Sequence, residues 1–345
     1  MSEQLLVPPY EKVKAKCSYF GTCGGCTFQD LEYNAQLELK RRLVEEALSA
    51  FNSSHSFVVS PTLPSPKPFH YRHMVAMTVK RRKDQLQFGF TSHDQRTFLS
   101  IESCPIADER INQFLPEALK RLEEMPPERK FHTSQVVLRV GDGGEVVTSL
   151  RADRGRKLEC KICGKIFSYS ISSFFQNNFS ILESFLETVR SFLKPKGQGT
   201  LFDLYSGVGF FGISLADSYK QVMGIEEGYE AVQLALENAK RNQVTNISFL
   251  EGKVELFLPE LTLQAAKPLH VVVDPPRVGL KPEVIQCLLK LPIDKLIYVS
   301  CELTALRRDL ELLQECFTIT KVQPLDLFPQ TKHVETIVLL QPKTA

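Results

Sequence analysis

Short apolar runs that end in a polar residue alternate with amphipathic segments in the second half of the chain, and this alternation constrains the fold most. Residues 269–273 precede Asp274, and residues 296–300 precede Cys301. Such runs predict strands, and strands buried on both faces that alternate with helices form parallel sheets. Ligands collect at the carboxyl ends of these strands. We therefore expect Asp274 and Cys301 to face one crevice, with Cys301 as a candidate nucleophile.

The same alternation covers residues 171–345, for which we predict a Rossmann-like, doubly wound α/β domain with a seven-stranded sheet. The expected strands are 200–205, 222–226, 247–250, 269–273, 296–300, 317–325 and 334–340, and the expected helices include 179–192, 208–216 and 231–241.

The first half of the chain divides into two further parts. Residues 1–60 combine a cysteine-rich loop with an amphipathic helix over 30–51. Residues 61–170 begin with an extended, proline-rich connector and continue as a β-rich α+β domain. Because its polar residues form no acid–base cluster, we expect this domain to bind rather than to catalyse. Its predicted strands are 71–79, 86–90, 136–140 and 145–150, with one helix near 108–125 and two strand cysteines, Cys160 and Cys163.

Closely spaced cysteines near the N-terminus predict an inorganic centre. Cys17, Cys23 and Cys26 form a C-x5-C-x2-C run with three glycines between them. The best candidate for a fourth ligand is Cys104, because a proline follows it as in ferredoxin-type motifs. A structural zinc site with four cysteine ligands is the alternative. The spacing alone does not separate the two.

Composition limits the class of protein. The 345-residue chain has a net charge of only +2, so any nucleic-acid surface must be a local patch. We see no apolar signal region and no apolar run that could cross a bilayer, so we expect a cytoplasmic protein without a membrane partner. In that compartment the nine cysteines are better read as thiols, ligands or catalysts than as disulfides.

A glycine-rich turn after residues 200–205 predicts a cofactor site. Gly207 and Gly209 begin a G-x-G-x-x-G pattern that by itself suggests a dinucleotide. Asp203 argues against that cofactor, because a carboxylate there would lie near a pyrophosphate. S-adenosylmethionine carries no phosphate, and its cationic groups attract a nearby anion. Glu226 ends the next strand and suits the ribose hydroxyls of either cofactor.

These motifs together resemble the iron–sulfur RNA (uracil-C5) methyltransferases, especially those that act on 23S ribosomal RNA. The resemblance runs from Cys17 to the C-terminus. It rests on the cysteine run, residues 173–178 (SFFQNN), residues 203–209 (DLYSGVG), residues 274–277 (DPPR), residues 300–301 (SC) and residues 333–336 (HVET).

The resemblance implies a role for each matching residue. Cys301 would be the nucleophile, Glu335 the base, and Phe174 a neighbour of the target base. The four cysteines named above would hold a [4Fe-4S] cluster, and the central domain would bind RNA. We expect a monomer that uses S-adenosylmethionine as cofactor, whose contacts would be Gln176, Asp203, Tyr205, Gly207, Gly209, Glu226 and Asp274.

The chemistry explains why a cysteine and a glutamate are needed. Uracil C5 is a weak nucleophile until a thiolate adds at C6 and makes C5 electron-rich. After methyl transfer, a base must remove the C5 proton so that the thiolate can leave. A glutamate near its ordinary pKa of about 4.3 is ionised at neutral pH, whereas a thiol near about 8.5 needs a pocket that favours the thiolate. The target uridine must be unpaired or flipped.

Other interpretations remain open. The substrate could be transfer RNA, although the cysteine cluster favours the ribosomal branch of the family. A cytosine-C5 methyltransferase would also use a cysteine, but its motifs differ from residues 274–277. A catalytically degenerate iron–sulfur RNA-binding protein is the alternative that is not an enzyme. Lys253 and Glu302 are its best support, since they depart from the residues that the family usually has at these places, and Phe210 is a third departure from the family pattern.

Overall fold

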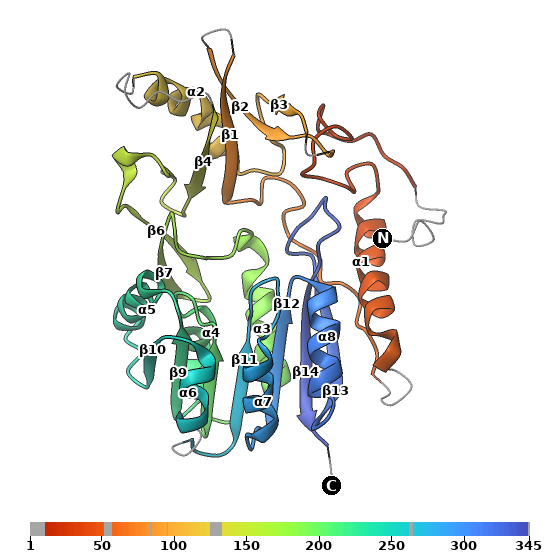
Figure 1. The fold of residues 1–345 in the computed structure, drawn as a ribbon, viewed down its shortest axis with the longest axis vertical. Helices are drawn as coiled ribbons and strands as arrows, with labels where there is room; N and C mark the ends of the chain where they lie inside the picture. Colours follow the sequence, from red (N-terminus) through yellow and green to blue (C-terminus); the bar gives the residue numbers. More distant parts are fainter. Residues whose placement is uncertain are drawn as a thin grey trace.

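The computed structural model describes residues 11–51, 57–82, 85–94, 96–124, 133–261 and 265–343. Two sheets dominate it, a seven-stranded sheet in the lower half of Figure 1 and a five-stranded sheet above. None of the helices in the described ranges combines the length and the apolar content needed to cross a membrane.

The larger sheet confirms the predicted seven-stranded α/β domain. Its order is β10-β9-β8-β11-β12-β14-β13, and β14 alone runs antiparallel to its neighbours. The strands are β8 (Thr200–Leu204), β9 (Gln221–Glu226), β10 (Ile247–Glu251), β11 (Leu269–Val273), β12 (Lys295–Ser300), β13 (Phe317–Leu325) and β14 (Glu335–Pro342).

Helices cover both faces of this sheet. On one face, α3 (Leu182–Leu193), α4 (Phe210–Leu215) and α5 (Tyr229–Arg241) share a core with the strands. On the other face lie α6 (Val254–Leu261), α7 (Pro282–Lys290) and α8 (Leu303–Leu313), together with the N-terminal helix. The carboxyl ends of β8, β9, β11 and β12 therefore meet at the edge that faces the upper sheet, where β14 begins (Figure 1).

The N-terminal helix is shorter than the sequence predicts. α1 spans Tyr33–Leu48, and a 3-10 turn, η2 (Ser49–Phe51), continues it. Residues 30–32 are not helical because their backbone bonds elsewhere, for example from Glu32 N to Glu11 O (3.3 Å). The proline-rich connector is extended, and it pairs in parallel with the edge of β13 through Ser60 N to Val322 O (3.0 Å).

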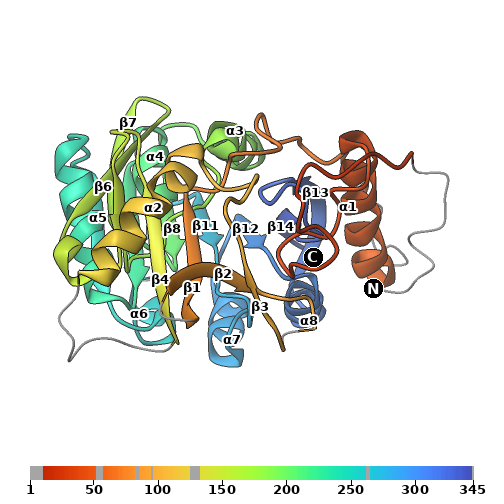
Figure 2. The same cartoon turned by 90° about the horizontal axis from the view of Figure 1, so that it is seen from above.

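The upper sheet has the order β3-β2-β1-β4-β5 and is antiparallel. Seen from above, β1 and β2 pass over the middle of the larger sheet (Figure 2). The apolar face of the sheet packs against α2 (Glu109–Glu123), the helix predicted near 108–125, which Asp108 caps. The strands are β1 (Met74–Arg82), β2 (Gln85–Thr91), β3 (Phe98–Ser100), β4 (Thr133–Val140) and β5 (Val146–Thr148).

A hairpin of β6 (Lys157–Ile162) and β7 (Lys165–Ser170) leads into the larger sheet's domain. Cys160 is buried in β6, as predicted, but the prediction of a strand at Cys163 is wrong. Cys163 and Gly164 have φ of 48° and 77° and form the two-residue turn. Their backbone twist suits a tight hairpin better than a continued strand. The domain boundary after residue 170 stays a prediction, since the hairpin shares its core with the larger sheet.

Candidate active site

Cys301 and Glu335 lie on adjacent strands at the edge where the strand ends meet. Ser300 of β12 pairs with Thr336 of β14. In antiparallel strands the next two residues along this register face each other, and these are Cys301 and Glu335. Glu335 is only 3% exposed, whereas Cys301 is half-buried. The topology thus brings the predicted nucleophile and the predicted base together.

The electrostatics of this pair differ from the expectation drawn from the sequence. Burial raises the pKa of Cys301 to about 11, an effect that Glu335 strengthens and a hydrogen bond from Arg277 weakens. Burial also raises the pKa of Glu335 well above its usual range. Without ligands, both groups therefore favour their neutral forms. The sequence-based expectation used the pKa of an exposed glutamate, but β14 starts in a water-poor site.

Asp274 and Arg277 complete this cluster from the loop after β11. The backbone N of Asp274 donates to Leu204 O (3.4 Å), which holds the loop against the end of β8. Burial raises the pKa of Asp274 to about 7. The sequence analysis gave Arg277 no role, although a cation three residues after a strand-end acid was the available signal. In the structure it opposes the upward pKa shifts of both Cys301 and Glu335.

The turn after β8 needs left-handed backbone at three of the predicted residues. Tyr205, Gly207 and Gly209 have φ of 64°, 54° and 87°. A Cβ at Gly209 would lie 2.7 Å from the Ile213 side chain, so glycine is required there for space as well. The turn ends where α4 begins.

Asp203 stabilises the glycine-rich turn after β8. Its side chain is fully buried, and Oδ2 accepts a hydrogen bond from Gly212 N (2.7 Å) in α4. Its Oδ1 has no hydrogen-bond partner within the described residues. Burial raises the pKa of Asp203 to about 7, while the bond from Gly212 lowers it. One carboxylate oxygen therefore holds α4, and the other is a buried acceptor without a partner among the described residues.

Glu226 connects the turn to the next strand. Its Oε2 accepts from Gly207 N (3.0 Å), and its Oε1 accepts from Gly228 N (2.8 Å). A carboxylate that accepts from two backbone amides keeps one fixed orientation. The residue at the end of β9 is thus placed beside the glycine-rich turn, as the sequence predicts.

A buried arginine positions the segment that carries Gln176 and Phe174. Arg139 of β4 is 1% exposed, and its guanidinium donates to the carbonyl oxygens of Ser170, Ser173 and Phe175 at 2.6, 2.6 and 3.0 Å. Gln176 is buried, whereas Phe174 is 68% exposed. The segment therefore buries the Gln176 amide and exposes the Phe174 ring to solvent. The sequence analysis did not predict the role of Arg139 in holding this segment.

Two departures from the family pattern have structural explanations. Phe210 packs in a buried aromatic cluster whose nearest ring pairs include Phe167 at 5.8 Å and Phe175 at 6.0 Å. Glu302 caps α8, because its side chain accepts from Thr304 N (3.4 Å). Neither residue blocks the site, so neither by itself indicates a degenerate enzyme. Lys253 is exposed just before α6.

The four predicted cysteine ligands line one cavity of about 890 Å³. Cys23 lies beside the end of β2, where Gly24 N donates to Thr91 O (3.3 Å). Cys104 sits in a turn that Asn112 of α2 holds through Cys104 N and O, at 2.8 and 3.0 Å. Burial raises the pKa of Cys26 to about 12, and the other three thiols raise it further. Segments far apart in sequence thus converge on one group of thiols.

Unpartnered polar atoms surround these thiols. Arg72 and Gln29 line the cavity, and Arg72 Nε and Gln29 Nε2 are buried N–H donors without a hydrogen-bond partner within the described ranges. Within those same ranges, no three His, Cys, Asp or Glu side chains converge closely enough to hold a metal ion. A single tetrahedral zinc would need thiolates at about 2.3 Å from one point. The two unpartnered donors are suited to a bound group that accepts hydrogen bonds.

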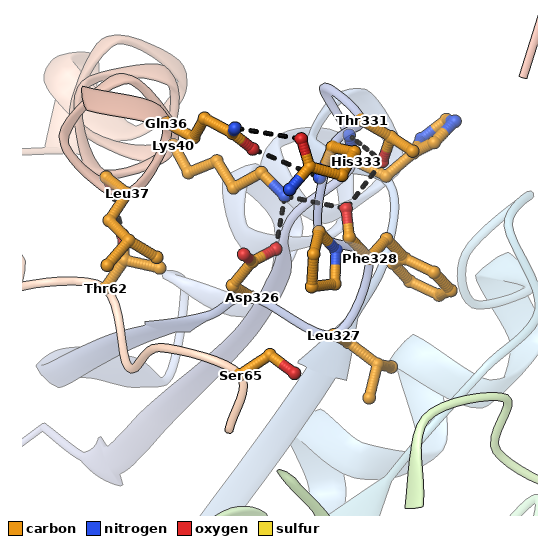
Figure 3. Close-up of polar contacts among 12 residues, drawn as sticks. Gln36, Leu37, Lys40, Thr62, Ser65, Asp326, Leu327, Phe328, Thr331 and His333 are labelled. Carbon is orange, nitrogen blue, oxygen red and sulfur yellow. Dashed lines mark hydrogen bonds and ion pairs between the residues drawn. The ribbon is translucent and has the colours of Figure 1, made fainter. Parts of the chain in front are cut away.

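The loop between β13 and β14 joins the cysteine cavity to the catalytic pair. Its residues Thr331 and His333 line the cavity, and two residues further on Glu335 begins β14. Figure 3 shows Gln36 and Lys40 of α1 reaching this loop, where Gln36 Nε2 donates to Gln330 Oε1 at 3.0 Å. The loop is therefore held from the N-terminal part of the chain.

The arrangement as a whole can support nucleophilic catalysis at a planar ring. It places a thiol, a buried carboxyl group and a guanidinium together, beside a glycine-rich turn that can hold a second ligand. No acid–base pair of this kind lies in the upper sheet within the residues that the structure describes.

Comparison with protein families supports this chemistry. Residues 155–343 match the family model described as tRNA (Uracil-5-)-methyltransferase. The matched region is more than half of the chain and contains every predicted catalytic and cofactor residue. It begins after the four cysteines, which the model does not cover.

Individual relatives extend the similarity to nearly the whole chain. An uncharacterized RNA methyltransferase of Aquifex aeolicus is 33% identical over 99% of this chain and 87% of its own length. The tRNA (uracil(54)-C(5))-methyltransferase of Schizosaccharomyces pombe is 32% identical over 94% of this chain and 65% of its own length. The crystal structure of a Pyrococcus abyssi tRNA (uracil-54, C5)-methyltransferase with S-adenosyl-L-homocysteine superposes with a TM-score of 0.70, at 26% identity, over 92% of this chain and 85% of that one.

Proposed function

Because the chain belongs to the RNA (uracil-C5) methyltransferases and catalyses S-adenosylmethionine-dependent methylation of uracil in RNA, we propose that Cys301 is its nucleophile and Glu335 its base. This assignment is supported by the end of the β12–β14 register, because Cys301 follows Ser300, whose partner Thr336 follows Glu335, and the charge of Glu335 raises the pKa of Cys301. S-adenosylmethionine supplies an electrophilic methyl group next to the glycine-rich turn.

The residues of the chain act in a fixed order. The Cys301 thiolate adds to C6 of uracil, and C5 becomes nucleophilic enough to take the methyl group. Glu335 then accepts the C5 proton, the C5–C6 double bond re-forms, and the thiolate leaves. The thioether bond that forms in the first step is thus broken in the last.

The protonation states follow from the local charges. In the ligand-free site the Cys301 thiol is neutral, and it must lose its proton before the thiolate can attack C6. Arg277 lowers the pKa of Cys301, and a bound sulfonium cation acts in the same direction. The raised pKa of Glu335 makes it a stronger base once it is ionised in the closed site.

The cofactor contacts that we propose are Gln176, Asp203, Tyr205, Gly207, Gly209, Glu226 and Asp274. The free oxygen of Asp203 and the amide-oriented carboxylate of Glu226 support this set. Both are anionic or hydrogen-bonding groups at the strand ends, where a cationic nucleoside with two ribose hydroxyls can bind.

We further propose that Cys17, Cys23, Cys26 and Cys104 hold a [4Fe-4S] cluster. The shared cavity and the unpartnered Arg72 and Gln29 donors support it, since cluster sulfides accept hydrogen bonds. The cluster would supply positive charge to four partly buried thiolates and connect their segments.

For the substrate we propose single-stranded or loop uridine in 23S ribosomal RNA, with Phe174 stacking near the target base. The cysteine cavity supports the ribosomal branch. Transfer RNA is the second candidate, because both relatives with a stated substrate act on tRNA uridine 54. Purified protein should be offered transcripts of both RNAs with labelled S-adenosylmethionine, followed by mapping of the methylated nucleotide. Methylation of the transfer RNA alone would overturn the ribosomal assignment.

A further inference from the structure

A second cavity of about 790 Å³ lies beside the hairpin, away from the cysteines. Three arginines within six residues, Arg151, Arg154 and Arg156, line it together with hydroxyl groups of Thr148, Ser149, Ser170 and Ser172. They follow β5 in the short helix η4 (Arg151–Asp153) and the turn before β6. The group is the densest run of arginines in the sequence. We call this cavity the arginine groove.

The charges in the arginine groove are unequally neutralised. Arg156 pairs with Asp153 (3.0 Å) and with Glu145. Arg151 and Arg154 are exposed, and neither has a carboxylate partner within the described residues. Among the residues that the structure describes, Glu230 is the only acid that lines the groove, and it accepts a hydrogen bond from Ser172 Oγ (2.7 Å). The hydroxyls of Thr148 and Ser172 already donate to Asp153 and Glu230. The groove therefore offers two guanidinium groups without carboxylate partners, and their N–H donors fit phosphate oxygens.

The arginine groove is connected to the catalytic edge in two ways. Ser172 is two residues from the exposed ring of Phe174, and Arg139 holds the backbone between Ser170 and Phe175 in place. Glu230 lies in the first turn of α5, which starts just after Glu226 and Gly228 at the end of β9. A polymer bound along the groove would therefore run onto Phe174 and toward the catalytic pair.

We propose that the arginine groove binds the phosphodiester backbone of the RNA strand next to the target uridine. This proposal rests on the proposed function, since it concerns the same substrate. RNA fits better than an acidic polypeptide because the groove leads to an exposed aromatic ring, on which an unpaired base can stack. Arg151 and Arg154 make the contacts, and Arg156 keeps the loop in shape through Asp153.

The test measures how RNA binding depends on salt. Each phosphate contact to single-stranded RNA contributes about 0.7 to the slope of log affinity against log salt. For an oligouridylate probe, Arg151→Gln with Arg154→Gln should therefore reduce that slope by about 1.4. S-adenosylmethionine binding and the rate at saturating RNA should stay unchanged, whereas KM for RNA should rise. The charge-preserving pair Arg151→Lys with Arg154→Lys should keep the wild-type slope.

The matched control is Arg307→Gln, which removes an exposed arginine on α8 that pairs with Glu311 (3.0 Å). It should leave the slope unchanged. An unchanged slope in the double Gln variant would overturn the proposal, and loss of polyglutamate binding in that variant would assign the groove to an acidic polypeptide. A different result would be a wild-type protein that fails to methylate the RNA and a double variant that still shows the reduced slope. That result would support RNA binding by the arginine groove and contradict the proposed substrate.

Discussion

Lys40 of α1 and Asp326 after β13 form an ion pair whose two side chains are both fully buried. Lys40 Nζ also donates to Phe328 O (2.9 Å), so one ammonium group holds two points of the loop that leads to Glu335 (Figure 3). Burial lowers the pKa of Lys40, and Asp326 opposes that shift. The pair connects the first helix of the chain to the segment that carries the base.

Lys40→Met should leave the Asp326 carboxylate buried and uncompensated. Removing one partner of a buried pair destabilises proteins by about 3–5 kcal/mol, which denaturant unfolding would show. The double variant Lys40→Met with Asp326→Leu should recover most of that loss. A single variant as stable as the wild type would mean that water reaches Asp326.

Glu335→Gln should separate the two halves of the reaction. The amide keeps the shape of the side chain but does not accept the C5 proton, so a methylated RNA–protein adduct should accumulate. Denaturing gels with labelled RNA should show a slow band that requires S-adenosylmethionine and is absent from Cys301→Ala. Normal turnover by the Gln variant without such a band would move the base's role to Asp274 or a water.

Stability should depend on pH through Asp203. Its pKa is about 7 in the folded protein, against about 3.9 for an exposed aspartate. The folded state therefore binds the proton more tightly, and this contribution to stability is complete below about pH 3.9 and is lost as the pH rises through 7. Unfolding free energies at pH 5 and pH 8 should differ less in Asp203→Asn than in the wild type. Equal differences would show that Asp203 is ionised in the folded protein at both pH values.

Glu226→Ala should weaken S-adenosylmethionine binding by roughly 1–3 kcal/mol, because an acceptor for the ribose hydroxyls is lost. Glu226→Gln retains one acceptor for Gly207 N and should lose less. Isothermal titration with S-adenosylmethionine, and with NAD as a control ligand, would measure both effects. Tight binding of NAD with none of S-adenosylmethionine would reverse the cofactor assignment.

Protein purified without oxygen should be brown and contain iron and sulfide. Cys26→Ser should lose the colour, because it removes one of the four thiolates that would hold the cluster. Cys163→Ser is the matched control, since Cys163 lies in the exposed hairpin turn and outside the cavity. Stoichiometric zinc in place of iron would show that the four cysteines form a structural zinc site.

The larger sheet could be predicted from the sequence because each apolar run that forms a central strand ends in a polar residue, which is a local pattern. The predicted bounds of β13 agree with the structure, and the polar residues after β11 and β12 meet at one edge as expected. The resemblance implied the roles of Cys301 and Glu335. That they lie close together follows from the antiparallel pairing of β12 with β14, which periodicity did not predict.

Other features could not be read from the sequence because they depend on distant contacts. Arg139 looks like an ordinary strand residue, yet it is buried against the carbonyls of another segment. Arg277 carried no role until the structure placed it beside Cys301. The raised pKa of Glu335 likewise arises from burial, which a tertiary structure alone defines.

The bonds between Gln36 and Gln330 join residues that are 294 positions apart. Free energies of local opening differ between parts of a protein, and a helix at the edge of a core opens more readily than central strands. Release of α1 would free the loop before β14 while β8, β11 and β12 stay folded. On gentle heating, methyl transfer should therefore cease at a lower temperature than the one at which the central sheet melts.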